Sequence, residues 1–174
     1  MSDSILIVVD YQCDFVSGAL GFPGAELLDE AISAKIGAYR AAGADVAFTM
    51  DTHGAGYLNT QEGRKLPVPH CLKGTPGWEL YGKTGAAKLE RDPCFYKPVF
   101  GSLELALWLQ KSAYRRIELV GLVSNICVIS NAVLVKAALP EAEVLVDAAC
   151  TASHDPELHR QTLAVLEGLQ IGIC

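Results

Sequence analysis

One cysteine of the sequence has the position of a nucleophile. Cys127 comes six residues after Gly121, at the expected junction of a buried strand and a helix. A sulfur over the first turn of a helix meets free N–H groups and the positive end of the helix dipole, which favour the thiolate and lower the thiol pKa. The same N–H groups could bind an oxyanion. Cys127 is therefore a candidate nucleophile; the alternative is a small buried hydrophobic residue, the commonest fate of a free cysteine.

Two further ionisable residues lie at expected strand ends. Asp10 directly follows the apolar run 5–9, where desolvation would raise its pKa and suit it to shuttle a proton. Its alternative role is that of a capping or turn-forming residue. Lys97 precedes Pro98, which favours extended geometry. Its charge would keep both a thiolate and a carboxylate ionised, unless it is a solvated surface lysine.

A second group of residues has the composition of a metal site. Asp51 and His53 are two apart, so in extended backbone both side chains face the same side. His70 lies in a later loop and could supply a third ligand. Two imidazoles and one carboxylate leave coordination positions open for water or substrate, as in catalytic metal sites. Surface histidines in a polar loop are the alternative explanation.

The elements that must position these residues alternate between short apolar runs and stretches of helical period. This pattern predicts one doubly wound α/β domain over residues 1–174, with a parallel sheet of about six strands and helices on both faces. Ligands should then bind at the carboxyl ends of the strands. We expect strands at 5–9, 45–50, 95–96, 117–120, 143–146 and 170–173, and helices at 25–42, 102–111, 125–138 and 155–168. Residues 54–83, with six Gly and three Pro, read as a long excursion over the surface, of a length that is usually functional.

Composition excludes several classes of protein. The net charge of −6 and the absence of a basic run argue against a nucleic-acid or anionic-membrane partner. The apolar fraction of 51% is that of an ordinary globular protein. The N-terminus is too acidic and its apolar run too short for a signal peptide or a membrane span. Six scattered cysteines without a CxxC pair indicate reduced thiols in a cytoplasmic protein.

Taken together, the segments that carry these residues resemble the cysteine hydrolases of the nicotinamidase/isochorismatase-like superfamily. Each segment alone is permissive, but five of them in the right order and spacing are specific, and they span nearly the whole chain. The segments are Val-Val-Asp10-Tyr-Gln-Cys-Asp-Phe15, Asp51-Thr-His53, His70-Cys-Leu-Lys-Gly-Thr-Pro-Gly, Lys97-Pro-Val-Phe-Gly-Ser102 and Gly121-Leu-Val-Ser-Asn-Ile-Cys127-Val.

The resemblance implies a role for each of these residues. It makes Asp10, Lys97 and Cys127 a catalytic triad, with the backbone N–H groups of Val123 and Cys127 as the oxyanion hole. It also implies a cis peptide bond before Val123. The metal ligands that it implies are Asp51, His53 and His70. Two imidazoles favour Zn²⁺ for the divalent metal, while Mn or Fe would accept the same set. Relatives often self-associate, so we expect a homo-oligomer.

The expected activity is hydrolysis of a small amide to acid and ammonia through a thioester, as in nicotinamidases. Phe15, Leu20 and Trp78 are the candidate substrate contacts. The sequence departs from nicotinamidases at Pro67, where they usually have a Trp.

Other departures are Cys13 in place of Asn and Ile126 in place of an aromatic residue. The alternatives are therefore an amidase for an N-carbamoyl, ureido or non-aromatic amide, or a catalytically silent module that binds a metal or a partner.

Overall fold

A single sheet of six parallel strands runs through the computed structural model, which describes residues 2–174. The order of the strands is β3-β2-β1-β4-β5-β6. Their bounds are Ser4–Val9 (β1), Asp45–Asp51 (β2), Cys94–Lys97 (β3), Arg116–Leu122 (β4), Glu143–Ala152 (β5) and Gly172–Ile173 (β6). The parallel six-stranded sheet predicted from the sequence is confirmed.

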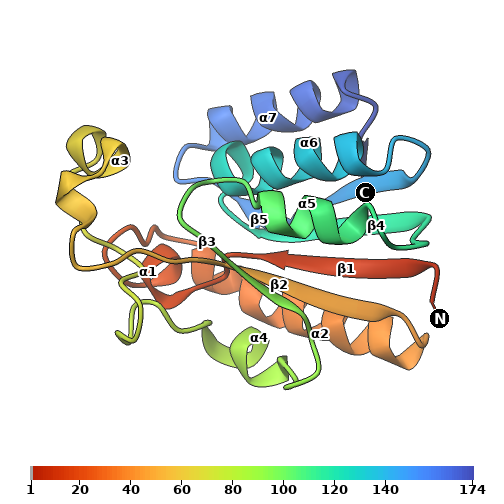
Figure 1. The fold of residues 1–174 in the computed structure, drawn as a ribbon, viewed down its shortest axis with the longest axis horizontal. Helices are drawn as coiled ribbons and strands as arrows, with labels where there is room; N and C mark the ends of the chain where they lie inside the picture. The colour runs from red at the N-terminus through yellow and green to blue at the C-terminus, as the bar shows by residue number, and fades with distance from the viewer. Residues whose placement is uncertain (1) are drawn as a thin grey trace.

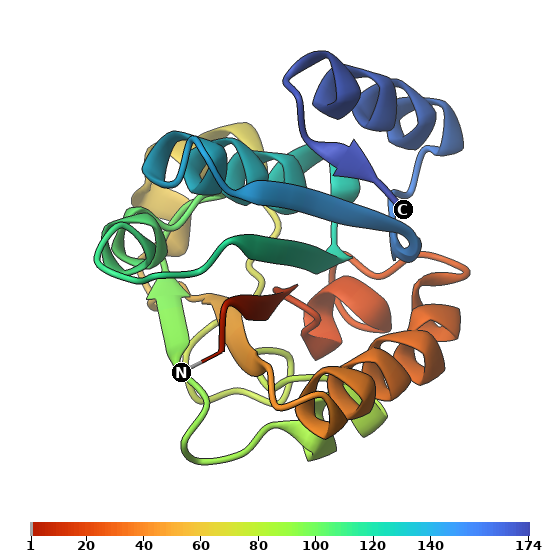
Figure 2. The same cartoon turned by 90° about the vertical axis from the view of Figure 1, so that its right-hand side faces the viewer.

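Helices cover both faces of the sheet (Figure 1). Helices α5, α6 and α7 lie on one face, and α2 with α4 lies on the other, as the view along the sheet also shows (Figure 2). The helices are α1 (Cys13–Val16), α2 (Leu28–Ala41), α3 (Gln61–Lys65), α4 (Gly82–Ala87), α5 (Leu103–Leu109), α6 (Ile129–Ala138) and α7 (Pro156–Gly168). Short turns of other helical types are η1 (Ala25–Leu27), η2 (Tyr57–Asn59) and η3 (Ser124–Val128).

The central strand β1 separates two hydrophobic cores. Ile5 and Ile7 pack in the core beneath α5, α6 and α7, while Leu6 and Val8 pack against Ile32 and its neighbours on α2. Successive side chains of a strand point to opposite faces, so a strand buried on both sides must be apolar throughout. This explains why the run after Ser4 contains no polar residue before Asp10.

Two helix starts predicted from the sequence are confirmed by their caps. The Ser102 hydroxyl accepts a hydrogen bond from the Leu105 N–H at 3.1 Å and begins α5. The Asp155 carboxylate accepts from the first free N–H groups of α7, with Pro156 in the first turn. Such caps satisfy backbone donors that have no partner within the helix.

Several bounds differ from the prediction. Strand β5 continues to Ala152, well beyond the apolar run at 143–146, and the last strand is only two residues long. The excursion at 54–83 contains η2 and α3 and leads into α4. Short helices of this kind have too few residues to show a helical period in the sequence. Their stability comes from packing, which the sequence does not display.

The order of the strands reverses beside β1, whose neighbours are β2 and β4. Chain segments that leave these strands turn away to opposite faces, and ligands of open α/β sheets bind at this point. Among residues 2–174, no helix has both the length and the apolarity that crossing a bilayer requires.

Gly121 allows β4 to approach β1 at this switch point. Its φ is +111°, and a Cβ added there would lie 2.0 Å from the Val9 carbonyl oxygen. We predict that Gly121→Ala lowers the free energy of unfolding by about 3 kcal/mol or more, because strain and overlap add. Gly37→Ala is the control: nothing lies within 4 Å of a Cβ at this α2 position, and a gain of about 0.5–1 kcal/mol is expected. Urea denaturation measures both, and equal effects would contradict the prediction.

Candidate active site

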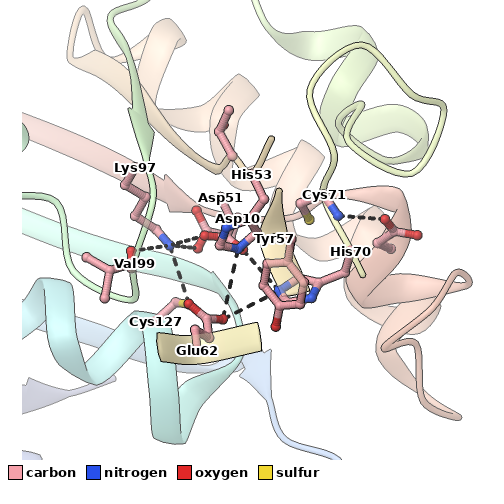
Figure 3. A network of polar contacts seen from close by, with 12 residues as sticks. Asp10, Asp51, His53, Tyr57, Glu62, His70, Cys71, Lys97, Val99 and Cys127 are labelled. Carbon is pink, nitrogen blue, oxygen red and sulfur yellow. Dashed lines mark hydrogen bonds and ion pairs between the residues drawn. The ribbon is translucent and has the colours of Figure 1, made fainter. Parts of the chain in front are cut away.

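Asp10, Lys97 and Cys127 meet at the carboxyl edge of the sheet (Figure 3). Lys97 Nζ lies 2.5 Å from Asp10 Oδ2 and 3.5 Å from Cys127 Sγ. The exposed fractions of the three residues are 0%, 2% and 4%, respectively. The contact that the sequence-based hypothesis requires is therefore present, in surroundings with almost no access to water.

Asp10 follows β1 directly, and its two carboxylate oxygens have different partners. Thr49 on the neighbouring strand donates its hydroxyl to Asp10 Oδ1 at 2.6 Å. Among the residues described, none donates a well-directed hydrogen bond to Oδ2, which faces Lys97. Burial raises the pKa of Asp10, and the charge of Lys97 and the hydroxyl of Thr49 oppose this only in part. A desolvated carboxylate can accept a proton, and here Oδ2 is the oxygen without a directed hydrogen bond.

The ammonium of Lys97 is surrounded by acceptors. Besides Asp10 and Cys127, it contacts the Val99 carbonyl at 3.1 Å and Asp51 Oδ1 at 3.4 Å. Burial alone would lower the pKa of Lys97, but the charges of Asp10, Cys127 and Asp51 outweigh it and raise the pKa. The side chain therefore stays positively charged.

Cys127 lies in η3, a single wide turn that precedes α6. The pKa of its thiol is raised well above the ordinary value, first by burial and then by Asp10, while Lys97 lowers it. The expectation that the start of a helix lowers this pKa is therefore wrong. Desolvation of the sulfur is the largest cause, and it disfavours the thiolate.

The backbone around Cys127 has the features expected of an oxyanion site. The peptide bond between Leu122 and Val123 is cis, as predicted. The Val123 carbonyl accepts hydrogen bonds from Ile126 N–H and Val128 N–H, each at 3.1 Å. The Cys127 N–H is not among its donors. The wide turn thus keeps this N–H from the partner that a regular helix would give it, and its use as an oxyanion donor remains a prediction.

Asp51, His53 and His70 form a compact donor set beside this triad. Asp51 Oδ2 lies 2.9 Å from His53 Nε2 and 3.3 Å from His70 Nε2, and one donor atom of each residue lies within 4.8 Å of the others. His70 Nδ1 lies 2.8 Å from the Val68 carbonyl and donates to it, so Nε2 is the nitrogen that faces Asp51 and could bind a metal.

The protonation of Asp51 also suits a metal ligand. Burial alone would raise its pKa, but hydrogen bonds with His53 and His70 and the charge of Lys97 lower it. The carboxylate is therefore ionised, and the residues fit a divalent metal.

Sequence reasoning missed Glu62, which lies on α3 over the donor set. Its Oε1 is 3.9 Å from His53 Nε2 and 3.7 Å from His70 Nε2. Burial and the charge of Asp51 raise the pKa of Glu62. This carboxylate could join the set as a fourth ligand. One Glu in a glycine-rich excursion carries no signal that distinguishes it from a solvated side chain.

Gln12 was also missed. Its amide accepts from the Asp51 N–H at 2.7 Å and donates to the Asp51 and Trp78 carbonyls at 2.9 and 2.8 Å. Gln12 therefore fixes the end of β2, where the metal set begins. The sequence offered one signal, which is the position of Gln12 within an apolar motif. An amide that is buried there must find hydrogen-bond partners.

The three candidate substrate contacts occupy different surroundings. The Phe15 ring centroid lies 5.6 Å from that of His70, beside the metal set. Leu20 is half-buried and packs on the core that faces α2. The indole N–H of Trp78 donates to the Thr52 hydroxyl at 2.9 Å, and its ring stacks on Tyr96. Trp78 is thus committed to other partners, and Phe15 has the contacts that best suit the predicted role.

The two histidines near the start of α7 differ from each other. His154 is exposed. His159 is half-buried, and its Nδ1 lies 3.0 Å from the hydroxyl of the fully buried Ser124. It therefore supports the turn that contains Cys127 and is not simply a surface residue.

Comparison with known proteins gives a consistent result. Residues 4–173 match the isochorismatase domain. An uncharacterized isochorismatase family protein, PncA, of Bacillus subtilis is 33% identical over 140 residues, which cover 74% of this chain and 75% of that protein. The nicotinamidase/pyrazinamidase of Mycobacterium tuberculosis is 30% identical over 142 residues, covering 71% and 73%.

Solved structures agree in fold over almost the whole chain. The pyrazinamidase of Pyrococcus horikoshii in complex with zinc has a TM-score of 0.86 and 25% identity, with 99% of both chains covered. The nicotinamidase/pyrazinamidase PncA of Bacillus subtilis has a TM-score of 0.86 and 27% identity, with 98% of both chains covered.

The donor set predicts that a divalent ion stabilises the fold. Zn²⁺ at about a hundredfold its Kd should contribute about 2.7 kcal/mol and raise Tm by several degrees. His70→Ala should abolish this shift by removing one of three ligands. His154→Ala removes an exposed imidazole and should leave the shift intact. Calorimetry with and without Zn²⁺ measures the effect, and a wild-type Tm that does not respond would contradict the metal site.

Proposed function

The chain belongs to the isochorismatase family, and we propose that it is a cysteine amidohydrolase for a small amide of the nicotinamide type. Residues 1–174 would act as one hydrolase domain. The observation that carries the proposal is the position of Lys97 Nζ, 2.5 Å from Asp10 and 3.5 Å from Cys127 in a buried site. A structural scaffold has no need of an acid, a base and a thiol in mutual contact, because burying charge costs free energy.

Attack begins with transfer of the thiol proton of Cys127 to Asp10 Oδ2. The sulfur forms a bond with the carbonyl carbon of the amide, and the carbonyl oxygen becomes an oxyanion. The N–H groups of Val123 and Cys127 donate hydrogen bonds to it. Lys97 stays charged and stabilises the negative charge as it moves from carboxylate to sulfur and substrate.

Collapse of this intermediate breaks the C–N bond. Protonated Asp10 gives its proton to the leaving nitrogen, so ammonia departs and a thioester with Cys127 remains. Asp10 then accepts a proton from water, which attacks the thioester carbonyl. The C–S bond breaks, the acid is released, and the proton returns to the sulfur.

Asp51, His53 and His70 would hold a divalent metal, for which Zn²⁺ is our first candidate. The zinc complex of the P. horikoshii pyrazinamidase supports this choice. When bound, the metal would supply a Lewis-acid site that binds and orients the substrate. The position of Phe15 beside His70 favours a flat, aromatic acyl group in the same space.

A second candidate substrate class follows from Pro67 and Trp78. Nicotinamidases usually have a Trp where this chain has Pro67, and Trp78 is bonded to Thr52. A pocket without that indole has less reason to prefer an aromatic ring. N-carbamoyl, ureido and aliphatic amides are therefore the competing substrates for the same triad.

Ammonia release from metal-replete protein against both substrate classes tests the proposal. We predict that nicotinamide and pyrazinamide are hydrolysed faster than N-carbamoyl, ureido and aliphatic amides. Cys127→Ala should lower kcat by about 10⁴-fold or more, because no other group can form the thioester. Cys174→Ala, which removes an exposed thiol, should leave kcat unchanged. Residual activity of Cys127→Ala within tenfold of wild type would refute the nucleophile.

The pH profile tests the role of Asp10 as base. Its pKa is raised, so the acid limb of kcat/KM should lie above the ordinary carboxyl pKa of 3.8, with activity lost as the pH falls through the raised value. The Thr49 hydrogen bond lowers this pKa. Thr49→Val should therefore move the limb to higher pH, by about half a unit to one unit for a bond of ~1 kcal/mol. A limb that stays in place or moves to lower pH would exclude Asp10 as the titrating base.

A further inference from the structure

The loop between β3 and α5 carries a contact of the triad, yet its side chains do not anchor it. The Val99 carbonyl accepts a hydrogen bond from Lys97 Nζ at 3.1 Å and is the only uncharged oxygen acceptor among that ammonium's described contacts. The side chains of Val99 and Phe100 are 49% and 41% exposed. Something other than hydrophobic burial must fix the course of this backbone.

The side chain of Asn131 holds this loop. Asn131 lies on α6, one turn after Cys127, and is fully buried. Its Nδ2 donates to the Phe100 carbonyl at 3.1 Å and to the Cys127 carbonyl at 2.8 Å. Its Oδ1 accepts from the Ser102 N–H at 2.9 Å. One amide thus joins both sides of the loop to the segment that carries the nucleophile.

The orientation of this amide is fixed by its partners. Two carbonyls require donors and one N–H requires an acceptor, so only one assignment of oxygen and nitrogen satisfies all three. Gly101 brings the loop against α6: a Cβ added there would lie 2.7 Å from Leu134 Cδ1 and 3.5 Å from Ser130 Cβ. The backbone of the loop therefore packs closely on side chains of α6 near the point where Asn131 bridges them.

We propose that Asn131 is a positioning residue of the reaction. By tying residues 100 and 102 to the Cys127 segment, it holds the Val99 carbonyl where it directs the Lys97 ammonium between Asp10 and Cys127. Asn131 touches none of the reacting atoms and acts through Lys97. The inference rests on the proposed function, because it assigns Lys97 the role of stabilising the sulfur anion.

A double-mutant cycle on the reactivity of Cys127 tests this inference. The variants are wild type, Asn131→Leu, Lys97→Met and the double variant, with Asn131→Ala in place of Leu if that protein does not fold. Leu has a similar volume but no polar group. The readout is the rate at which iodoacetamide alkylates Cys127 at pH 7, followed by mass spectrometry of its peptide, at a temperature where circular dichroism shows every variant folded.

Asn131→Leu should slow alkylation about fivefold, which corresponds to the loss of roughly one hydrogen bond. Lys97→Met should slow it further, and adding Asn131→Leu to Lys97→Met should change the rate by less than twofold. Thr162→Val is the matched control, since it removes a buried hydroxyl that bonds to its own helix, and it should have no effect.

Two outcomes would overturn the inference: an unchanged rate for Asn131→Leu, or the same slowing with and without Lys97, which indicates a structural role alone. If Lys97→Met itself leaves the rate unchanged, the proposed function loses the role of Lys97, and the inference fails with it. The two failures are thus distinguishable.

Discussion

Lys97 carries its charge with only 2% of its surface exposed, and a buried ammonium persists only where anions and acceptors surround it. Its contacts come from the ends of two strands, from the turn η3 after β4 and from the loop after β3. Asp10 follows β1, Asp51 ends β2, and Cys127 follows β4. Loss of any one charged partner would leave the others facing an unbalanced charge. The ion pair of Lys97 with Asp10 is therefore the constraint that fixes the edge of the sheet and the course of the loops above it.

The charges around this cation extend beyond the triad. Asp10 and Asp51 face Lys97, and Glu62 lies over the histidines that contact Asp51. Three carboxylates and one ammonium leave two negative charges, which a divalent cation at the donor set would neutralise. Asp51 belongs to both groups. A change of charge at the donor set therefore acts on Cys127 through the contacts of Lys97 with Asp51 and with the sulfur.

The sequence predicted the ends of β1 and β2 well because their chemistry is local. A run buried on both faces must be apolar, so the first polar residue after it, such as Asp10, marks the edge of the sheet. Contacts between distant segments left weaker signals. Nothing near Glu62 or Asn131 in the sequence reveals that one lies over two histidines and the other joins a loop to a helix. The thiol pKa was misjudged for the same reason: the helix start is visible in the sequence, but the burial of Cys127 is not.

A raised thiol pKa is compatible with nucleophilic attack, because the relevant quantity is the difference between the pKa values of Cys127 and Asp10. Burial raises the pKa of Asp10 and that of Cys127, so desolvation largely cancels when a proton passes from sulfur to carboxylate. Lys97 lies beside both groups and keeps a charge-stabilising contact whichever of them holds the proton. The negative charge thus passes from the carboxylate to the sulfur while it stays beside the Lys97 ammonium. In a site arranged in this way, the sulfur can lose its proton to the neighbouring carboxylate as it attacks an electrophile.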